Sequence, residues 1–514
     1  MSLLPISFRR TCVRLGPAGT VVVAAILISG CGDAYRPVVT PIGPSGPAQQ
    51  PEALAVAVSS PSPTSPGVAT IIDYAGDTVM AQADIGPGPL EFAVDQGGST
   101  GYTLNGDGTL TNFDVSTSLR TDPIHVRYST LPTTAEPYGL FAPSAGLWAA
   151  DLTGNVADVL TGSPETFKLA IPVASTPIAI IGPGSLGQDN YAISQNIPYG
   201  SICNTNPSSV TTNGEADALE TASYSVSAKI ALGACPVYAV SSSDGRRVFV
   251  LNRGSDTVTV INSQNDDLDS CTPFTNQNGQ LVTCHPSLPL STTAVGATGI
   301  TPPNGTAGMP VHAGPVYAEY NAATAQLVVA DYDGGTISVI DVSLDEYGND
   351  SATFGTTYTI PVGNTSTPYP ASVTVLFDGS RAYTANQGDD DGTGNGTVSI
   401  VNLSSHSVEK TLAVVGHPRT VVSTSNSLYG KVYVDSPDSP YLTIIRTDQD
   451  IVDTTILLEG NVVDVRTSNQ NGSSGNAVNT SRRPGAGQPC YLPPTLEPAP
   501  TGSQTALQVC QTLP

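Results

Sequence analysis

Three consecutive aspartates before a glycine-rich stretch form the cluster whose composition most directly suggests chemistry. Asp389, Asp390 and Asp391 begin a segment, Asp-Asp-Asp-Gly-Thr-Gly-Asn-Gly, that ends at Gly396. Calcium takes about six to eight oxygen ligands, and an acidic loop can wrap them around one ion. The spacing differs from that of an EF-hand, and the segment lies where a turn between two strands belongs. A solvated turn is therefore favoured, and calcium is the one cofactor that the sequence suggests.

Two histidines occupy equivalent points of a repeated pattern, each shortly before a proline that begins an apolar strand. His312 precedes Pro315 and His417 precedes Pro418, in a chain with only five histidines. Side chains at such points can face the centre of a ring of repeats, where two imidazoles could bind a metal or exchange protons. The two repeats are not adjacent and no third ligand is evident, so a structural role is favoured.

No catalytic motif is found elsewhere in the chain. The sequence has no Gly-x-Ser-x-Gly nucleophile elbow, no His-Glu-x-x-His zinc motif and no phosphate-binding glycine loop before a helix. Its carboxylates are numerous but scattered, so their spacing selects no acid–base pair. No catalytic residue is predicted.

Six cysteines beyond the N-terminal region are candidates for disulfide bonds. They are Cys203, Cys235, Cys271, Cys284, Cys490 and Cys510. An even number in an exported chain indicates disulfides, because that compartment is oxidising. Sequence neighbours are the expected pairs, since each pair sits within or beside one irregular segment. Metal ligation has no Cys-x-x-Cys motif to support it.

Residues 1–30 have the composition of a secretory signal peptide. Three arginines precede an apolar stretch centred on residues 21–28, which is shorter than the roughly 20 apolar residues that span a bilayer. The stretch ends in Ile28-Ser29-Gly30-Cys31, which resembles the lipobox of bacterial lipoproteins. That resemblance implies that Cys31 becomes the lipid-modified first residue of the mature chain. We expect an anchor on the extracytoplasmic side of a bacterial membrane, in the periplasm or at the cell surface.

The mature chain is strongly acidic. Removal of residues 1–30 leaves 16 basic and 43 acidic residues, a net charge of −27. Such a surface repels phosphate backbones, which excludes nucleic acid as a partner. Residues 31–67 are rich in proline, serine and glycine and predict a tether. The expected partners are the lipid bilayer and a protein or small-molecule ligand, and the chain is expected to be monomeric.

A module of short strands recurs through the rest of the chain. Each copy has an apolar strand that begins with proline, a turn that is often Asp-Gly, and further strands of alternating pattern. The copies begin at Pro89, Pro137, Pro177, Pro236, Pro315, Pro370 and Pro418. Four-stranded propeller blades take about 40–50 residues, so two of the intervals contain insertions. The predicted class is all-β, a propeller of seven or eight blades.

The two ends of the repeat region supply parts of one more module. Residues 70–82 resemble the second half of a module, and residues 461–466 resemble an isolated first strand. One split blade built from both termini would close the ring and leave no free edge. The predicted propeller therefore spans residues 68–466. A partly disordered tail is expected at 467–514, with a disulfide as a means of pinning it.

The second strands of two copies carry a recognisable signature. Val248–Asn252 and Ala382–Asn386 resemble the Tyr-Val-Thr-Asn signature of the YVTN-type β-propeller repeats. Val328–Asp331 and Val432–Asp435 are degraded copies. The family implies a propeller, commonly seven-bladed and often secreted or at the cell surface, but no single activity.

Specificity is expected in the insertions, because loops on a rigid scaffold carry function. The insertions are residues 199–222 and 264–312, and the second includes Asp266, Asp267, Asp269 and Phe274. An anchor, a tether and a repeat body without catalytic motifs favour a lipoprotein whose propeller is a binding or scaffold module. The alternative is a propeller enzyme of the lactonase or quinone-dependent dehydrogenase type, acting at the central channel.

Overall fold

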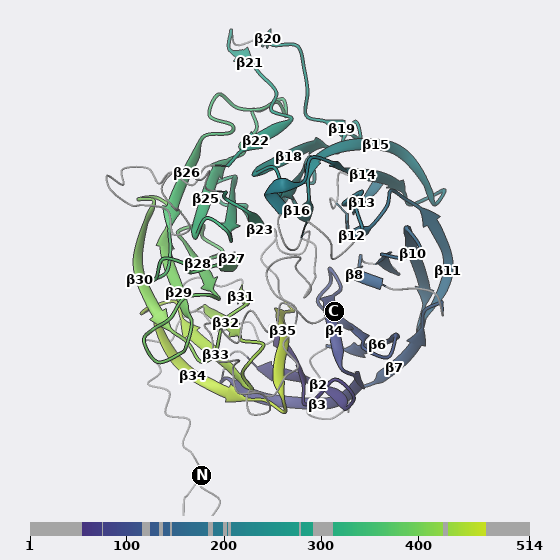
Figure 1. Cartoon of the computed structure of the whole chain (residues 1–514), viewed down its shortest axis with the longest axis vertical. Helices are drawn as coiled ribbons and strands as arrows, with labels where there is room; N and C mark the ends of the chain where they lie inside the picture. Colours follow the sequence, from purple (N-terminus) through teal and green to yellow (C-terminus); the bar gives the residue numbers. More distant parts are fainter. Residues whose placement is uncertain are drawn as a thin grey trace, which may run out of the picture. The chain divides into compact units, whose positions relative to one another are not determined.

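The computed structural model describes residues 54–468 apart from internal gaps at 74–75, 116–123, 133–136, 144–145, 183–188, 199–202, 204–206, 277–278, 291–311 and 425–429. The described residues all belong to one compact unit, residues 49–514. No helix among them is long and apolar enough to cross a membrane. The fold is an eight-bladed β-propeller of four-stranded sheets, as Figure 1 shows.

Each blade is an antiparallel sheet whose strands follow one another from the centre outward (Figure 1). The innermost strands of blades 1 to 8 are β4 (Pro89–Val94), β8 (Pro137–Phe141), β12 (Pro177–Ile181), β16 (Pro236–Ser241), β23 (Pro315–Asn321), β27 (Pro370–Val375), β31 (Thr420–Ser423) and β35 (Asn461–Thr467). The second strands, in the same order, are β5 (Thr100–Asn105), β9 (Leu147–Asp151), β13 (Asp189–Ser194), β17 (Arg247–Asn252), β24 (Gln326–Asp331), β28 (Arg381–Asn386), β32 (Lys431–Asp435) and β1 (Leu54–Ser60).

The outer half of each blade continues the same pattern. The third strands are β6 (Thr109–Asp114), β10 (Val156–Gly162), β14 (Asn213–Glu220), β18 (Thr257–Asn262), β25 (Thr336–Asp341), β29 (Thr397–Asn402), β33 (Tyr441–Arg446) and β2 (Pro66–Asp73). The outermost strands are β7 (Val126–Thr130), β11 (Glu165–Pro172), β15 (Ser225–Ala234), β26 (Thr357–Pro361), β30 (Ser407–Ala413), β34 (Ile451–Leu457) and β3 (Thr78–Pro87). Blade 4 has two short strands there, β19 (Asp267–Leu268) and β22 (Ser287–Pro289).

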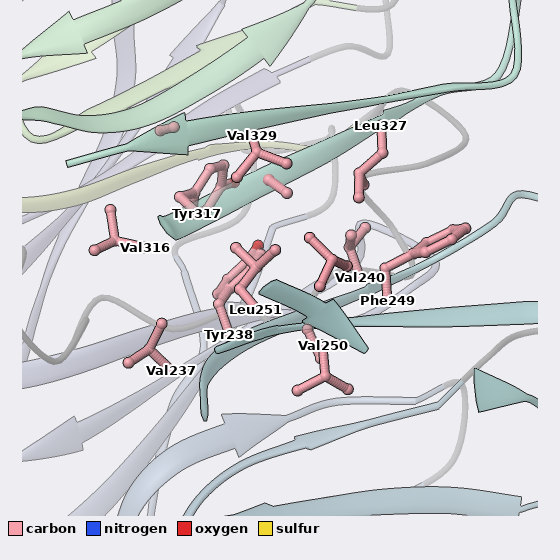
Figure 2. Packing of buried hydrophobic residues seen from close by; sticks show 14 of the residues in the cluster. Val237, Tyr238, Val240, Phe249, Val250, Leu251, Val316, Tyr317, Leu327 and Val329 are labelled. Atoms are coloured by element: carbon pink, nitrogen blue, oxygen red, sulfur yellow. The ribbon is translucent and has the colours of Figure 1, made fainter. Parts of the chain in front are cut away.

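The inner strands are continuous apolar runs and the outer strands are more polar, because the two kinds of strand differ in burial. Every residue of β16 and β17 is buried, because a blade packs against a neighbour on each of its two faces. In β34 no residue is fully buried, since the outermost strand borders solvent. Figure 2 shows the packing between blades 4 and 5, where Tyr238 and Leu251 face Tyr317 and Val329. Each such side chain contributes roughly 1.5–3 kcal/mol of burial free energy.

Blade 8 combines strands from both ends of the described chain. Strand β35 pairs with β1, and it contacts β31 of blade 7 on one side and β4 of blade 1 on the other. The ring is thereby closed, and the predicted first strand at residues 461–466 is confirmed. The count is eight blades, the larger of the two predicted numbers.

The predicted tether overlaps the propeller and is corrected at residues 54–67. Leu54–Ser60 is a strand, and the proline- and serine-rich stretch that follows is the turn between β1 and β2. Ser62 donates its hydroxyl to Ser65 Oγ at 2.7 Å, and the Gly88 amide donates to the Ser65 carbonyl at 3.1 Å. Strand β1 is buried between β2 and β35. Composition alone assigns its small residues to a linker.

Candidate functional site

The asparagine of the repeat signature holds the second and third strands of a blade together. Asn252 donates its side-chain amide to the hydroxyls of Thr257 at 3.2 Å and Thr259 at 2.9 Å. Asn386 makes the same bonds to Thr397 at 3.0 Å and Ser399 at 2.8 Å. The signature asparagine is therefore a structural residue of the blade.

In blades 3 and 6 a tyrosine at the signature position links the blade to the next one. Tyr383 of blade 6 donates its hydroxyl to Asp450, which lies in the turn between the third and fourth strands of blade 7. Tyr191 of blade 3 makes the equivalent bond to Asp266 of blade 4. Burial together with the adjacent carboxylate raises the pKa of both tyrosines, so each hydroxyl stays a donor. The tyrosine and asparagine of the repeat motif are thus structural residues of the propeller.

The carboxylates of the triple-aspartate loop all accept hydrogen bonds from backbone amides, those of Asp390 and Asp391 within the loop itself and that of Asp389 from a neighbouring loop. Asp389 is buried and accepts the amides of Asn364 at 2.8 Å and Thr365 at 2.7 Å. Asp391 accepts the amide of Thr393 at 2.7 Å and its hydroxyl at 2.6 Å, and these bonds lower the pKa of Asp391. Asp390 accepts the Gly392 amide at 2.7 Å. Among the described residues no group of three or more acidic, histidine or cysteine side chains is placed to hold a metal ion.

The two equivalent histidines each pair with an aspartate in a turn between a second and a third strand. His312 Nδ1 lies 2.6 Å from Asp256 Oδ2, and His417 Nδ1 lies 2.6 Å from Asp438 Oδ2. The bond to Asp438 raises the pKa of His417 against the opposing effect of burial. The two histidines enter blades 5 and 7, so the structure does not bring them together.

The His417 pair predicts a pH-dependent contribution to stability. A histidine whose folded-state pKa is raised stabilises the fold below its ordinary pKa and loses this contribution as the pH rises through the folded-state value. We expect His417→Gln to lower the free energy of unfolding by about 1 kcal/mol near pH 5.5 and by less near pH 8.5, measured by urea denaturation. His406→Gln is the control with the opposite trend, because burial lowers the pKa of His406. A loss for His417→Gln that is independent of pH would contradict the pair.

Both described disulfides join sequence neighbours, as predicted. Cys203 bonds to Cys235, which directly precedes β16, and Cys271 bonds to Cys284 within blade 4. Cys31, Cys490 and Cys510 lie outside the described residues. The predicted insertion at 199–222 is corrected, because Asn213–Glu220 is β14, the third strand of blade 3. Only the segment before β14, with the short 3-10 helix η1 (Pro207–Ser209), is inserted.

The insertion of blade 4 interrupts the outer edge of its sheet. Strand β19 pairs with Ile261 and Asn262 at one end of β18, and β22 pairs with residues 257–259 at the other. Between them the chain leaves the sheet as a disulfide-closed hairpin with strands β20 (Phe274–Thr275) and β21 (Leu281–Val282). Figure 1 shows this hairpin extending outward beyond the rim of the propeller. We call residues 271–284 the hairpin.

A buried ionic cluster holds the base of the hairpin against blade 5. Arg247 Nη2 lies 3.1 Å from Asp269 Oδ1 and 3.4 Å from Asp350 Oδ1, and all three side chains are almost fully buried. His285 Nδ1 lies 2.7 Å from Asp350 Oδ2, and its ring stacks on Phe354 at a centroid distance of 5.2 Å. Burial raises the pKa of Asp350 to about 6, opposed by His285. Arg247 thus pairs with a carboxylate from the hairpin's base and with one from blade 5, and joins the two.

The ionic cluster is the part of the candidate site that the sequence did not predict. The insertion and its Asp269 were identified, but Arg247 and Asp350 were not. The sequence does contain a pattern that could have identified Arg247. It occupies the first position of its signature strand, as Arg381 does in blade 6. Arg381 bonds to Asp450 of blade 7, so a basic residue at this position points to an acid in the next blade.

Comparison with known proteins supports the fold. No family model and no curated protein matches the chain. Similar solved structures include AztD of Citrobacter koseri, with 11% identity, a TM-score of 0.52 and coverage of 81% of this chain and 98% of AztD. Another is dihydro-heme d1 dehydrogenase NirN in complex with DHE, with 14% identity, a TM-score of 0.52 and coverage of 85% of this chain and 79% of NirN. At these identities the likeness establishes the propeller fold alone.

Proposed function

We propose that this chain is a lipoprotein anchored by acyl chains on Cys31 outside the cytoplasm, whose propeller is a binding module of the YVTN type. The lipobox-like residues 28–31 motivate the anchor, and the two disulfides fit an oxidising compartment. The tether would meet the propeller at a fixed point. The Leu54 amide donates to Ser468 Oγ at 2.9 Å, and the Ser468 amide donates to the Leu54 carbonyl at 2.8 Å.

The observation that carries the binding role is the exposed hairpin of blade 4. Leu281 is 66% exposed and Phe274 is 43% exposed, although exposure of apolar side chains lowers stability. The disulfide and the buried Arg247 cluster restrict the motion of this segment, which reduces the entropy that binding would otherwise cost. A rigid support beneath exposed apolar residues is the arrangement of a binding surface.

The anchor is tested by replacing the proposed lipidation site. We expect Cys31→Ala to abolish incorporation of radiolabelled palmitate and to move the protein out of the washed membrane fraction. Cys12→Ala is the matched control, because Cys12 lies before the proposed cleavage site and should leave labelling unchanged. Labelling that persists in the Cys31→Ala protein would contradict the anchor.

The binding role is tested against the enzymatic alternative with the purified mature chain. We expect no turnover of sugar lactones with added divalent metal, and none of alcohols with an added quinone. Turnover of either substrate class would replace the binding role with an enzymatic one.

A further inference from the structure

The hairpin differs in charge from the rest of the molecule. Residues 270–284 contain no charged side chain, in a chain with 43 acidic residues. Its sheet positions nearest the tip, Phe274, Thr275 and Leu281, are all exposed. If these exposed positions served only solubility, they would carry charged side chains. The neutral, apolar tip therefore needs another explanation.

The two exposed apolar residues lie on opposite sides of the hairpin. Phe274 is paired across the ladder with Val282, and Leu281 is paired with Thr275. Residues directly opposite in an antiparallel ladder share a face, and successive residues alternate. A flat partner surface could cover only one of these side chains. A pocket that encloses both faces of the β20–β21 ladder would cover both.

Asn276 and Gln280, near the end of the hairpin, are bonded to each other, and Asn276 is also bonded to blade 5. The Asn276 amide donates to the Gln280 carbonyl at 2.8 Å, and the Gln280 amide donates to Asn276 Oδ1 at 2.9 Å. The Asn276 side chain also bonds to Asp345, in the loop between the third and fourth strands of blade 5. Tyr347 of the same loop is 52% exposed. The hairpin therefore contacts this loop through Asn276.

Three acidic residues lie on the elements next to the hairpin. Asp267 lies in β19 at the start of the insertion, and the blade 5 loop carries Asp345 and Glu346. Hydrogen bonds to its carboxylate lower the pKa of Asp345, so it stays ionised. Arg246, which lies close to Gly348 of the loop, is already paired with Asp244 at 3.5 Å. The rim of the surface is therefore negative.

We propose that the hairpin inserts into an apolar pocket of a second protein whose rim carries lysine and arginine. This inference rests on the proposed binding function and names the partner class. A basic rim complements Asp267, Asp345 and Glu346 and speeds association. A second copy of this chain is disfavoured as the occupant, because the mature chain brings the same net charge of −27, from 16 basic and 43 acidic residues. An anionic lipid surface is disfavoured for the same reason.

The test is selection from a phage-displayed library of random peptides against the purified mature chain. We expect the selected peptides to combine aromatic or aliphatic residues with lysine or arginine. Synthetic versions should bind about tenfold or more weakly to the Phe274→Ser, Leu281→Ser double variant. Their affinity should also fall as salt rises from about 0.05 to about 0.5 M. Because both side chains are exposed, the double variant should keep its melting temperature.

Phe377→Ser is the matched control, since Phe377 is 57% exposed but lies in a turn of blade 6. Its peptide affinity should equal that of the unmodified chain. Peptides that depend on the hairpin but lack basic residues would overturn the partner class and leave the binding function standing. Peptides that bind both variants equally would overturn the hairpin as the binding surface. Hairpin-dependent dimers in sedimentation experiments would make a second copy the occupant and overturn the proposal.

Discussion

Replacement of Asp450 by alanine is expected to lower the free energy of unfolding by about 3 kcal/mol. The carboxylate of Asp450 in blade 7 accepts hydrogen bonds from two groups of blade 6, the Arg381 guanidinium and the Tyr383 hydroxyl. Tyr383 is fully buried, so the variant leaves its hydroxyl without this acceptor, and the guanidinium loses its carboxylate. Urea denaturation of the mature chain, followed by circular dichroism, measures the loss.

Two variants separate the bond between blades from general effects of charge. Tyr383→Phe removes only the hydroxyl and should cost about 1 kcal/mol. Asp453→Ala removes an exposed carboxylate of the neighbouring β34 and should change stability by less than about 0.5 kcal/mol. Equal effects of Asp450→Ala and Asp453→Ala would show that Asp450 does not join the blades.

Asp331→Asn is expected to stabilise the protein at alkaline pH. Asp331 of blade 5 stands where Asn252 and Asn386 stand in blades 4 and 6, and it is fully buried. Thr336 and Ser338 donate to its Oδ2 at 3.1 and 2.7 Å. Burial nevertheless raises the pKa of Asp331 to about 7. An asparagine would keep the hydroxyl contacts without a buried charge.

The direction of the pH dependence follows from proton binding. Between the ordinary pKa of an aspartate and about 7, the folded state keeps a proton that the unfolded state has lost, so stability falls as the pH rises through this range. The asparagine variant does not lose stability in this way, because its side chain does not titrate. Its advantage should reach roughly 3 kcal/mol near pH 8 and nearly vanish near pH 4.5, in unfolding curves at each pH. A variant that is less stable at both pH values would mean that the carboxylate itself is required.

Patterns within single blades were predictable from the sequence, because they depend on neighbouring residues. The alternation in Thr397–Asn402 and the apolar run at Pro236–Ser241 indicated strands, and the isolated strand at residues 461–466 indicated closure of the ring. Strand β1 was missed because its alanines, valines and serines border a proline-rich stretch that resembles a linker. Strand β14 was missed because the disulfide-bonded segment before it hides the regular spacing.

Bonds between blades could not be predicted, since they depend on which turn faces which strand. Asp450 lies 67 residues beyond Tyr383, and Asp350 lies 103 residues beyond Arg247. Spacing along the chain does not reveal either pair. The sequence identified the blade 4 insertion and Phe274 in it, and Phe274 is exposed there; that the insertion binds a partner stays a prediction. The contacts of the hairpin with blade 5, through Asp350, could not be predicted, because only the fold brings these residues close.

The pairing of β1 with β35 imposes an order on folding. Leu54 and Ser468 are 414 residues apart, so their contact closes nearly the largest loop that the propeller contains, at an entropic cost that rises with the logarithm of its length. During synthesis β1, β2 and β3 are made first, and one side of β1 stays unpaired until β35 is made. An unpaired strand edge is a template for aggregation. Residues 461–467, the last of the described strands to be made, are therefore the segment on which the earliest strands depend for pairing.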